Sequence, residues 1–223
     1  MIKIKMTGNM ITEENLPEHQ FWRLNRIQYP VYSLGPGKRI GIWVQGCSLK
    51  CRNCISSDLW NFNGGKEISL QYLAAQIFNI SASFDGITVT GGEPFDQYFS
   101  LLNFCRIIKK LTDLNIMIYS GYTIEEIADN QMSEIFSQID FLMDGRFETA
   151  QHSSDHMRGS RNQKFYVFHC GKPSFCSEDF SNAPWSVKTA EDGTVYLAGI
   201  PGPGEISEIE LDLKKRGMRV EFQ

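Results

Sequence analysis

Apolar residues along this chain recur at two spacings, one typical of strands and the other typical of helices. Short runs rich in β-branched and aromatic residues predict strands at 39–45, 87–90, 115–120, 139–145 and 164–169. Apolar positions three or four residues apart predict helices at 67–81, 97–113 and 123–138. At the start of the last helix, Thr123 and Glu126 have the spacing of a capping box. Strands that alternate with helices predict an α/β fold, in which helical crossovers join the strands of a parallel sheet.

The pattern changes after residue 183. Two short apolar segments, 185–189 and 194–200, flank a Glu-Asp-Gly turn and predict a hairpin. A helix is predicted at 201–217, followed by a last short strand at 218–222. We therefore expect a C-terminal extension that packs on the core. The expected divisions are an N-terminal extension (1–29), a core (30–170) and the C-terminal extension (171–223).

Polar or glycine-rich residues directly follow four of the predicted strands. These segments are Cys47–Cys54, Gly91–Pro94, Ser120–Thr123 and Asp144–Arg146. In barrels and in open α/β sheets alike, ligands bind where the carboxyl ends of parallel strands meet. The four segments therefore converge on one rim, which is the predicted site.

Charge and composition narrow the setting. The formal net charge is -4 and no long run of like charges occurs, so a large nucleic-acid-binding surface is not indicated. No apolar stretch is long enough to span a membrane, and the N-terminal residues lack the apolar region of a secretory signal, which favours the cytoplasm. Segment 19–39 mixes aromatic residues with Arg and Lys, as nucleic-acid-binding segments do. An edge strand that connects to the core is the preferred interpretation.

Three of the six cysteines, Cys47, Cys51 and Cys54, lie close together in the chain. In a reducing compartment, clustered cysteines are more often metal ligands or catalytic groups than disulfide partners. Three thiolates can hold three irons of a [4Fe-4S] cube and leave the fourth iron open to a substrate or cofactor. The alternative is a zinc site completed by a histidine or another cysteine, although no histidine lies near the loop in sequence. The cysteines alone leave both possibilities open.

The remaining cysteines and histidines carry weaker signals. Cys105 lies on an apolar run with helical spacing and is predicted to be a buried thiol. Cys170 and Cys176 bracket a short loop and would form an incomplete metal site. His152 and His156 have i, i+4 spacing that could hold a metal on a helix, but the polar residues around them favour a loop over the site.

The segment Thr-Gly-Gly-Glu-Pro-Phe (90–95) follows a strand on the same rim. Paired glycines let the backbone approach a ligand closely, and Glu93 adds an acceptor suited to an ammonium group. Together with the cysteine spacing, this segment resembles the radical S-adenosylmethionine (SAM) superfamily, whose signature is CxxxCxxC after one strand and GGE after the next. Within it, the chain is most similar to activating enzymes of glycyl radical proteins, especially that of anaerobic ribonucleotide reductase. The matching residues are 35–54, 90–95, 119–123, 139–147 and 158–164.

The resemblance implies a partial, open β/α barrel of the radical SAM type, with a small C-terminal hairpin-and-helix appendage. It also implies that Cys47, Cys51 and Cys54 ligate a [4Fe-4S] cluster, and that the amino and carboxylate groups of SAM chelate the open iron. Asn53, just before the third cysteine, departs from the family, many members of which carry an apolar residue or glycine near the adenine.

The resemblance further implies a SAM site on the loops after the strands. Gly91, Gly92 and Glu93 would bind the methionine amino group, and Pro94 would close the turn. The other positions match contacts to polar groups of the cofactor. Arg146, with its forked donors, is suited to the carboxylate. The implied positions are Gly91, Gly92, Glu93, Pro94, Ser120, Asp144 and Arg146.

The implied reaction begins when the reduced cluster passes an electron to SAM, which is cleaved to methionine and a 5′-deoxyadenosyl radical. The substrate would be a glycine Cα–H in a partner glycyl radical protein, so a peptide loop must enter the rim. A low-potential donor such as flavodoxin or ferredoxin would supply the electron, and no membrane partner is expected. Two alternatives stay open, a radical SAM enzyme that modifies a peptide, nucleotide or small molecule, and a non-enzymatic zinc or iron–sulfur module.

Overall fold

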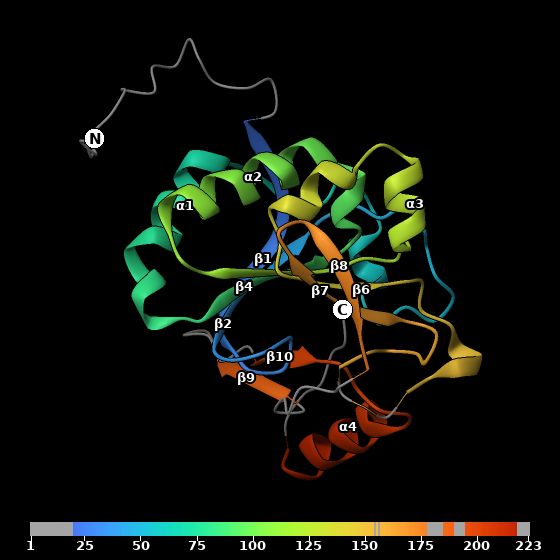
Figure 1. The fold of residues 1–223 in the computed structure, drawn as a ribbon. Coiled ribbons are helices and arrows are strands. Elements are labelled where there is room, and N and C mark those ends of the chain that lie inside the picture. Colours follow the sequence, from blue (N-terminus) through green and yellow to red (C-terminus); the bar gives the residue numbers. More distant parts are fainter. Residues whose placement is uncertain (1–19, 154, 156, 178–184, 190–194, 218–223) are drawn as a thin grey trace.

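A computed structural model of the chain describes residues 20–153, 155, 157–177, 185–189 and 195–217. Its main feature is an eight-stranded sheet with the order β3-β1-β2-β4-β5-β6-β7-β8 (Figure 1). The strands are β1 (Phe21–Val31), β2 (Arg39–Val44), β3 (Lys66–Ser69), β4 (Gly86–Gly91), β5 (Asn115–Tyr119), β6 (Phe141–Asp144), β7 (Lys164–His169) and β8 (Lys172–Cys176). The helices and the separate hairpin are α1 (Leu70–Ile80), α2 (Tyr98–Leu111), α3 (Ile124–Asp129), β9 (Trp185–Thr189), β10 (Val195–Gly199) and α4 (Glu205–Lys215).

The centre of the sheet is parallel, as the sequence predicts, and its flanks are antiparallel. Strands β2, β4, β5 and β6 run parallel to one another. Strands β1 and β3 pair antiparallel on one side, and β7 and β8 do so on the other. The described residues of the segment 145–163 between β6 and β7 form a 3-10 turn at Thr149–Gln151 but no α-helix. Two neighbouring parallel strands need a long crossover connection between them. The connection from β6 to β7 does not supply one, so β7 pairs antiparallel with β6.

Side chains on the central strands alternate between two packed faces. On β2, Ile40, Ile42 and Val44 belong to the large core that also includes apolar residues of α1 and α2. The side chain of Trp43 lies on the other face, in a smaller cluster with Ala198 of β10. Figure 1 shows α1, α2 and α3 on one side of the sheet, with β9, β10 and α4 on the opposite side. Strands buried on both faces explain the continuous apolar runs of the sequence.

The sheet is open in the described part of the chain, because its outermost strands β3 and β8 do not pair with each other. This agrees with a partial barrel. The sheet reaches beyond the expected core of residues 30–170 at both ends, since β1 begins at Phe21 and β8 ends at Cys176. Residues 21–31 of segment 19–39 form the antiparallel strand β1, so a strand is present as interpreted, but it is not an edge strand because β3 pairs on its outer side.

The C-terminal hairpin is attached to the sheet by hydrogen bonds near the end of β1. The Ser33 hydroxyl donates to the Ala198 carbonyl oxygen at 2.7 Å, and the Tyr32 N–H donates to Ser186 Oγ at 2.7 Å. The hairpin and the helix after it occur where the sequence predicts them. The strand predicted at 218–222 lies outside the described residues.

Three predicted elements differ in the structure. The helix predicted at 67–81 begins at Leu70, because 66–69 form β3 against β1 and Ser69 caps the helix. The helix predicted at 123–138 is divided into α3 and a 3-10 segment at 133–137, since Gln131 has a φ of +59° that ends the first piece. The presumed loop between Cys170 and Cys176 is mostly strand β8.

No helix among the described residues is both long and apolar enough to cross a membrane.

Candidate functional site

The cysteine loop follows β2 directly and carries three free thiols. Cys47 is buried, whereas Cys51 and Cys54 are half-buried. Two residues of the loop have left-handed backbone, with φ of +47° at Lys50 and +60° at Asn53. Asparagine tolerates this conformation better than most residues, which gives a backbone reason for Asn53 where the family pattern differs.

The ends of this loop are held together by backbone hydrogen bonds. The Gly46 N–H donates to Leu59 O at 2.8 Å, and the Cys47 N–H donates to Trp60 O at 3.2 Å. The short 3-10 turn Ser57–Leu59 buries Leu59. Residues 46–60 thus form a closed loop whose base is fixed by the buried end of β2.

The loop after β4 is bonded to the cysteine loop. The Gly92 N–H donates to Val44 O at 2.9 Å, and the Glu93 N–H donates to Gly46 O at 2.8 Å. A Cβ atom at Gly92 would collide with the Gly46 carbonyl oxygen, and Gly91 has a φ of +106°. Both positions therefore require glycine, and the paired glycines bring the two loops into contact.

Asp96 makes a second connection between the two loops. Its carboxylate accepts hydrogen bonds from the Ser48 N–H at 2.6 Å and from the Ser48 hydroxyl at 2.9 Å. The Tyr122 hydroxyl, from the loop after β5, also donates to Asp96 at 3.1 Å. One carboxylate therefore links three of the four predicted rim segments.

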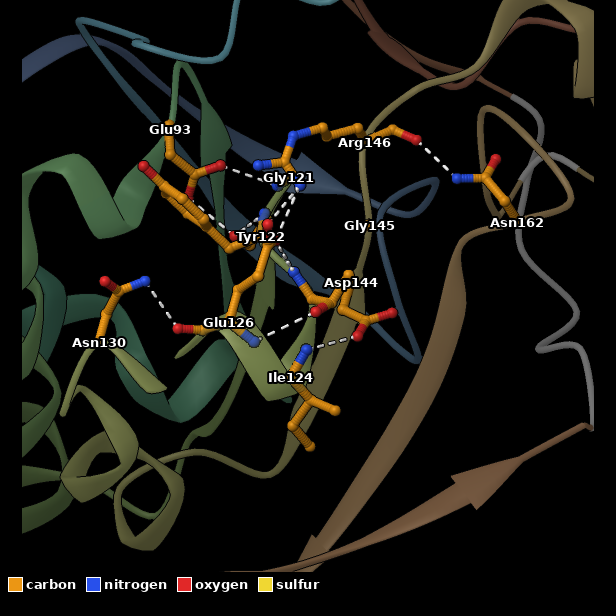
Figure 2. A network of polar contacts seen from close by, with 12 residues as sticks. Glu93, Gly121, Tyr122, Ile124, Glu126, Asn130, Asp144, Gly145, Arg146 and Asn162 are labelled. Carbon is orange, nitrogen blue, oxygen red and sulfur yellow. Dashed lines mark hydrogen bonds and ion pairs between the residues drawn. The ribbon is translucent and has the colours of Figure 1, made fainter. Parts of the chain in front are cut away.

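Glu93 lies beneath this rim, with its side chain 1% exposed. Its Oε1 accepts from Ser120 Oγ at 2.8 Å and from the Phe95 N–H at 3.0 Å. Its Oε2 accepts from the Gly121 N–H at 2.8 Å, and Figure 2 shows Glu93 beside Gly121. Burial raises the pKa of the Glu93 carboxyl to about 7, although these hydrogen bonds act against the increase. The side chains of Glu93 and Ser120 thus bond to the protein, while the backbone of the glycines faces the cysteine loop.

Asp144 and Arg146 occupy the fourth segment, after β6. Asp144 is buried and accepts from the Ile124 N–H at the start of α3 at 2.7 Å. Arg146 Nη1 donates to both carboxylate oxygens of Glu126, at 2.9 and 2.8 Å, and its guanidinium lies over the Tyr122 ring (Figure 2). A Cβ atom added at Gly121 would meet both Leu49 of the cysteine loop and Cγ of Arg146, which places Arg146 near that loop.

The structure therefore brings all four predicted segments to one edge of the sheet. Pro94 is buried at the start of a 3-10 turn at 94–97, as a residue that closes a turn should be. The sequence does not reveal the residues that connect the segments. For Glu126 it predicts the capping box with Thr123 but not the bond to Arg146. The connecting residues are Ser48, Asp96, Tyr122 and Glu126.

The other candidates lie apart from this edge or have structural partners. Cys105 is fully buried on α2, as predicted, and burial raises the pKa of its thiol to about 12. Cys170 is exposed beside β8. The His152 ring contacts the Pro201 carbonyl oxygen at 3.1 Å, and His156 lies outside the described residues.

Comparison with known proteins identifies the cysteine chemistry. The family model described as "4Fe-4S single cluster domain" matches residues 33–166, which include the cysteine loop and all four rim segments. The chain belongs to this single-cluster 4Fe-4S family. It is a radical SAM protein of the activating-enzyme branch, and its cofactors are a [4Fe-4S] cluster and SAM.

The relatives of this 4Fe-4S protein agree with that assignment. It is 32% identical to the anaerobic ribonucleoside-triphosphate reductase-activating protein of Pasteurella multocida, over 65% of this chain and 98% of that one. It is 27% identical to the protein of the same name from Enterobacteria phage T4, over 59% and 85% of the two chains. A shorter match, 35% identical over 34% of each chain, is to the pyruvate formate-lyase-activating enzyme of Clostridium pasteurianum. Among solved structures, QueE from Escherichia coli overlaps 46% of this chain and 54% of its own at 20% identity, with a TM-score of 0.39.

The donor set of this 4Fe-4S protein fits its cluster. Among the residues that the structure describes, no three His, Cys, Asp or Glu side chains converge as ligands of a single metal ion. A cube takes each thiolate on a separate iron, so the spread of the three cysteines does not conflict with a cluster. Burial raises the pKa of the Cys47 and Cys54 thiols, while nearby backbone N–H groups favour their charged forms.

Proposed function

We propose that this protein activates a partner by installing a glycyl radical on it, as the names of its relatives suggest for an anaerobic ribonucleotide reductase. The observation that carries the proposal is the contact between the loop of three free thiols and the Gly-Gly-Glu-Pro loop. These two loops share an edge of an open sheet with Ser120 and Arg146. Three thiols on one loop leave one iron of a cube free for a cofactor.

The cluster, when bound, supplies the electron that cleaves SAM to methionine and a 5′-deoxyadenosyl radical. The protein's own residues bind and orient the reactants. Cys47, Cys51 and Cys54 hold the cluster. The backbone of Gly91 and Gly92 lies beside the cysteine loop, where it can accept and donate hydrogen bonds to the methionine amino end.

The remaining rim residues have separate parts in this proposal. Arg146 supplies a fork of donors for the methionine carboxylate and would exchange its bond to Glu126 for one to the cofactor. Ser120 and Glu93 fix the shape of the Gly-Gly-Glu-Pro loop from beneath. Asp144 has an indirect role. It accepts a hydrogen bond from the Ile124 N–H at the start of α3 and thereby fixes the position of Glu126 on that helix.

The partner's glycine would reach the site from the open side. A surface pocket of about 590 Å³ lies directly beside the cysteine loop. Its lining includes Arg52 and Asn53 of that loop and Phe147, Glu148 and Thr149 of the segment after β6. A peptide loop that enters this pocket would lie between the cysteine loop and the segment after β6.

Anaerobic reconstitution tests the proposal. The protein should bind about four irons and, with dithionite and SAM, release 5′-deoxyadenosine. Addition of a candidate glycyl radical protein should produce the doublet of a glycyl radical in electron paramagnetic resonance. Cleavage of SAM without that doublet, together with hydrogen transfer into a small molecule, would favour a metabolite-modifying enzyme. Bound zinc and no release of 5′-deoxyadenosine would disprove radical chemistry.

Two finer points belong to the same proposal. Flavodoxin or ferredoxin would supply the electron, since a cluster of this type needs a low-potential donor. The cytoplasm is the proposed location, because clustered thiols that serve as ligands require a reducing compartment.

A further inference from the structure

Tyr122 is the residue at which the loops of all four rim segments meet. Its hydroxyl donates to Asp96, in the loop after β4, at 3.1 Å and lies 3.3 Å from the Ser48 hydroxyl of the cysteine loop. Its backbone N–H donates to Ser120 Oγ at 3.0 Å, and its carbonyl oxygen accepts from the Gly145 N–H, after β6, at 3.3 Å. The backbone and the hydroxyl end of the side chain are both bonded, so the position of the phenol ring on the rim is fixed.

The Arg146 guanidinium lies over the face of this ring. Its central carbon is 5.7 Å from the ring centroid, and Figure 2 shows the guanidinium beside Tyr122. The negative face of an aromatic ring attracts a cation at this distance. The contact leaves hydrogen bonds from the guanidinium to other groups possible, as the two bonds from Nη1 to Glu126 show.

The backbone of Arg146 is held in place, whereas its side chain is partly exposed. Asn162 Nδ2 donates to the Arg146 carbonyl oxygen at 2.8 Å. The side chains of Arg146 and Glu126 are each more than a third exposed. A long exposed side chain that exchanges Glu126 for the methionine carboxylate would gain rotamer freedom during the exchange, and binding would have to remove it again. The Tyr122 ring limits that freedom, because the exchange does not involve the ring face.

We propose that the face of the Tyr122 ring holds the Arg146 guanidinium in position for the carboxylate of SAM. This inference deepens the proposed function and rests on the role that it gives to Arg146. It makes Tyr122 a positioning residue, because the ring acts through Arg146. The Tyr122 hydroxyl has a separate role, since its bond to Asp96 fixes the ring relative to the cysteine loop.

The test compares Tyr122→Leu with Tyr122→Phe. Both variants lose the hydroxyl and its contacts with Asp96 and Ser48, but phenylalanine keeps the ring face. The Kd for SAM should be about threefold higher in Tyr122→Leu than in Tyr122→Phe, as expected for a cation–π contact at an exposed site. Anaerobic calorimetry on reconstituted proteins of equal iron content measures both values. Equal Kd values in the two variants would overturn the inference.

A double-mutant cycle tests whether the ring acts through Arg146. Arg146→Met removes the cation, so Tyr122→Leu and Tyr122→Phe combined with it should bind SAM equally. A difference that persists in this background would show that the ring acts on its loop and not on Arg146, and the inference would fail. If Arg146→Met alone binds SAM as wild type does while keeping its iron, the role of Arg146 in the proposed function fails instead.

A second measurement covers the case in which Tyr122→Leu does not retain iron. Phenylalanine analogues with one, two or three ring fluorines at position 122 keep nearly the shape of the Tyr122→Phe side chain, while each fluorine withdraws negative charge from the ring face. The Kd for SAM should rise with each fluorine added, whereas a purely structural role would not follow the number of fluorines. A Kd that stays constant along the series would overturn the inference.

Discussion

The Ser120 hydroxyl donates a 2.8 Å hydrogen bond to Glu93 Oε1, although the two residues are 27 positions apart in the chain. This bond joins the loops after β4 and β5 beneath the rim. The same Ser120 oxygen accepts from the Tyr122 N–H at 3.0 Å, so the bond also fixes the turn that carries Tyr122. A buried carboxyl group is therefore the central support of the proposed SAM site.

Glu93→Gln should remove a pH dependence of stability. Burial raises the pKa of the Glu93 carboxyl in the folded protein to about 7, above its ordinary value of 4.5, so the folded state binds the proton more tightly than the unfolded state does. This contribution is fully present below the unfolded pKa and is lost as pH rises through the folded pKa, in total about 3 kcal/mol. Urea unfolding of the iron-free protein at several pH values between 4.5 and 7.5 measures it.

The comparison with Gln isolates this one group. Glutamine cannot titrate, so the difference in unfolding free energy between wild type and Glu93→Gln should change with pH across that window and level off above it. A difference that stays constant with pH would show that the carboxyl group of Glu93 does not titrate there.

Replacement of Cys47, Cys51 or Cys54 by alanine should abolish binding of the cluster. Each thiolate holds a separate iron, and with one removed the cube retains only two protein ligands. Cys105→Ala is the control, because the buried Cys105 thiol lies on α2 within the core and should not affect iron content. Iron and sulfide analysis after anaerobic reconstitution checks both. A requirement for Cys105 or Cys176 would contradict the three-ligand assignment.

Asp96→Asn should loosen the cluster without removing a ligand. The carboxylate accepts two bonds from Ser48, inside the cysteine loop, and an amide can replace only part of this set. Loss of about 1.4 kcal/mol would speed the release of iron to a chelator roughly tenfold, which absorbance of the iron–chelator complex would follow.

Asp85→Asn is a matched control for this experiment. Asp85 also accepts a backbone N–H, from Lys38 at 2.7 Å, but it precedes β4 and lies at the opposite ends of the strands. Iron release from this variant should equal that from wild type. Equal rates for both variants and wild type would mean that the Asp96 contact does not hold the cysteine loop in place.

Local patterns in the sequence were enough to predict the central fold and the position of the rim. The apolar runs of β2, β4, β5 and β6 are buried on both faces, and a motif after each parallel strand must reach the same edge. The antiparallel direction of β7 was not predictable in the same way, because it depends on the connection at 145–163, whose described residues form no α-helix.

The hydrogen bonds that join the rim segments could not be predicted from the sequence either. Asp96 and Ser48 are 48 residues apart, and each is an ordinary polar residue in its own segment. The capping box of Thr123 and Glu126 was predictable because both halves lie within one helical turn. The additional bond from Glu126 to Arg146 depends on the packing of α3 beside β6, which no local pattern reveals.

Arg146→Met should weaken SAM binding more than it weakens the fold. The ion pair of Arg146 with Glu126 is 40% and 37% exposed in its two side chains, so its loss should cost less than about 1 kcal/mol of stability. A charge-assisted bond from Arg146 to the methionine carboxylate is worth about 1.5 kcal/mol or more, so the Kd for SAM should rise at least about tenfold. Anaerobic calorimetry on the reconstituted protein measures this Kd.

Glu126→Gln separates the proposed role of Arg146 in binding SAM from its role in the ion pair with Glu126. Glutamine can keep the capping box with Thr123, yet it removes the charge that competes for the guanidinium. SAM binding in Glu126→Gln should therefore equal or exceed that of wild type, while thermal stability falls slightly in both variants. If Arg146→Met binds SAM as wild type does while keeping its iron, Arg146 serves only to hold α3, and the methionine carboxylate must be bound by another group on the rim.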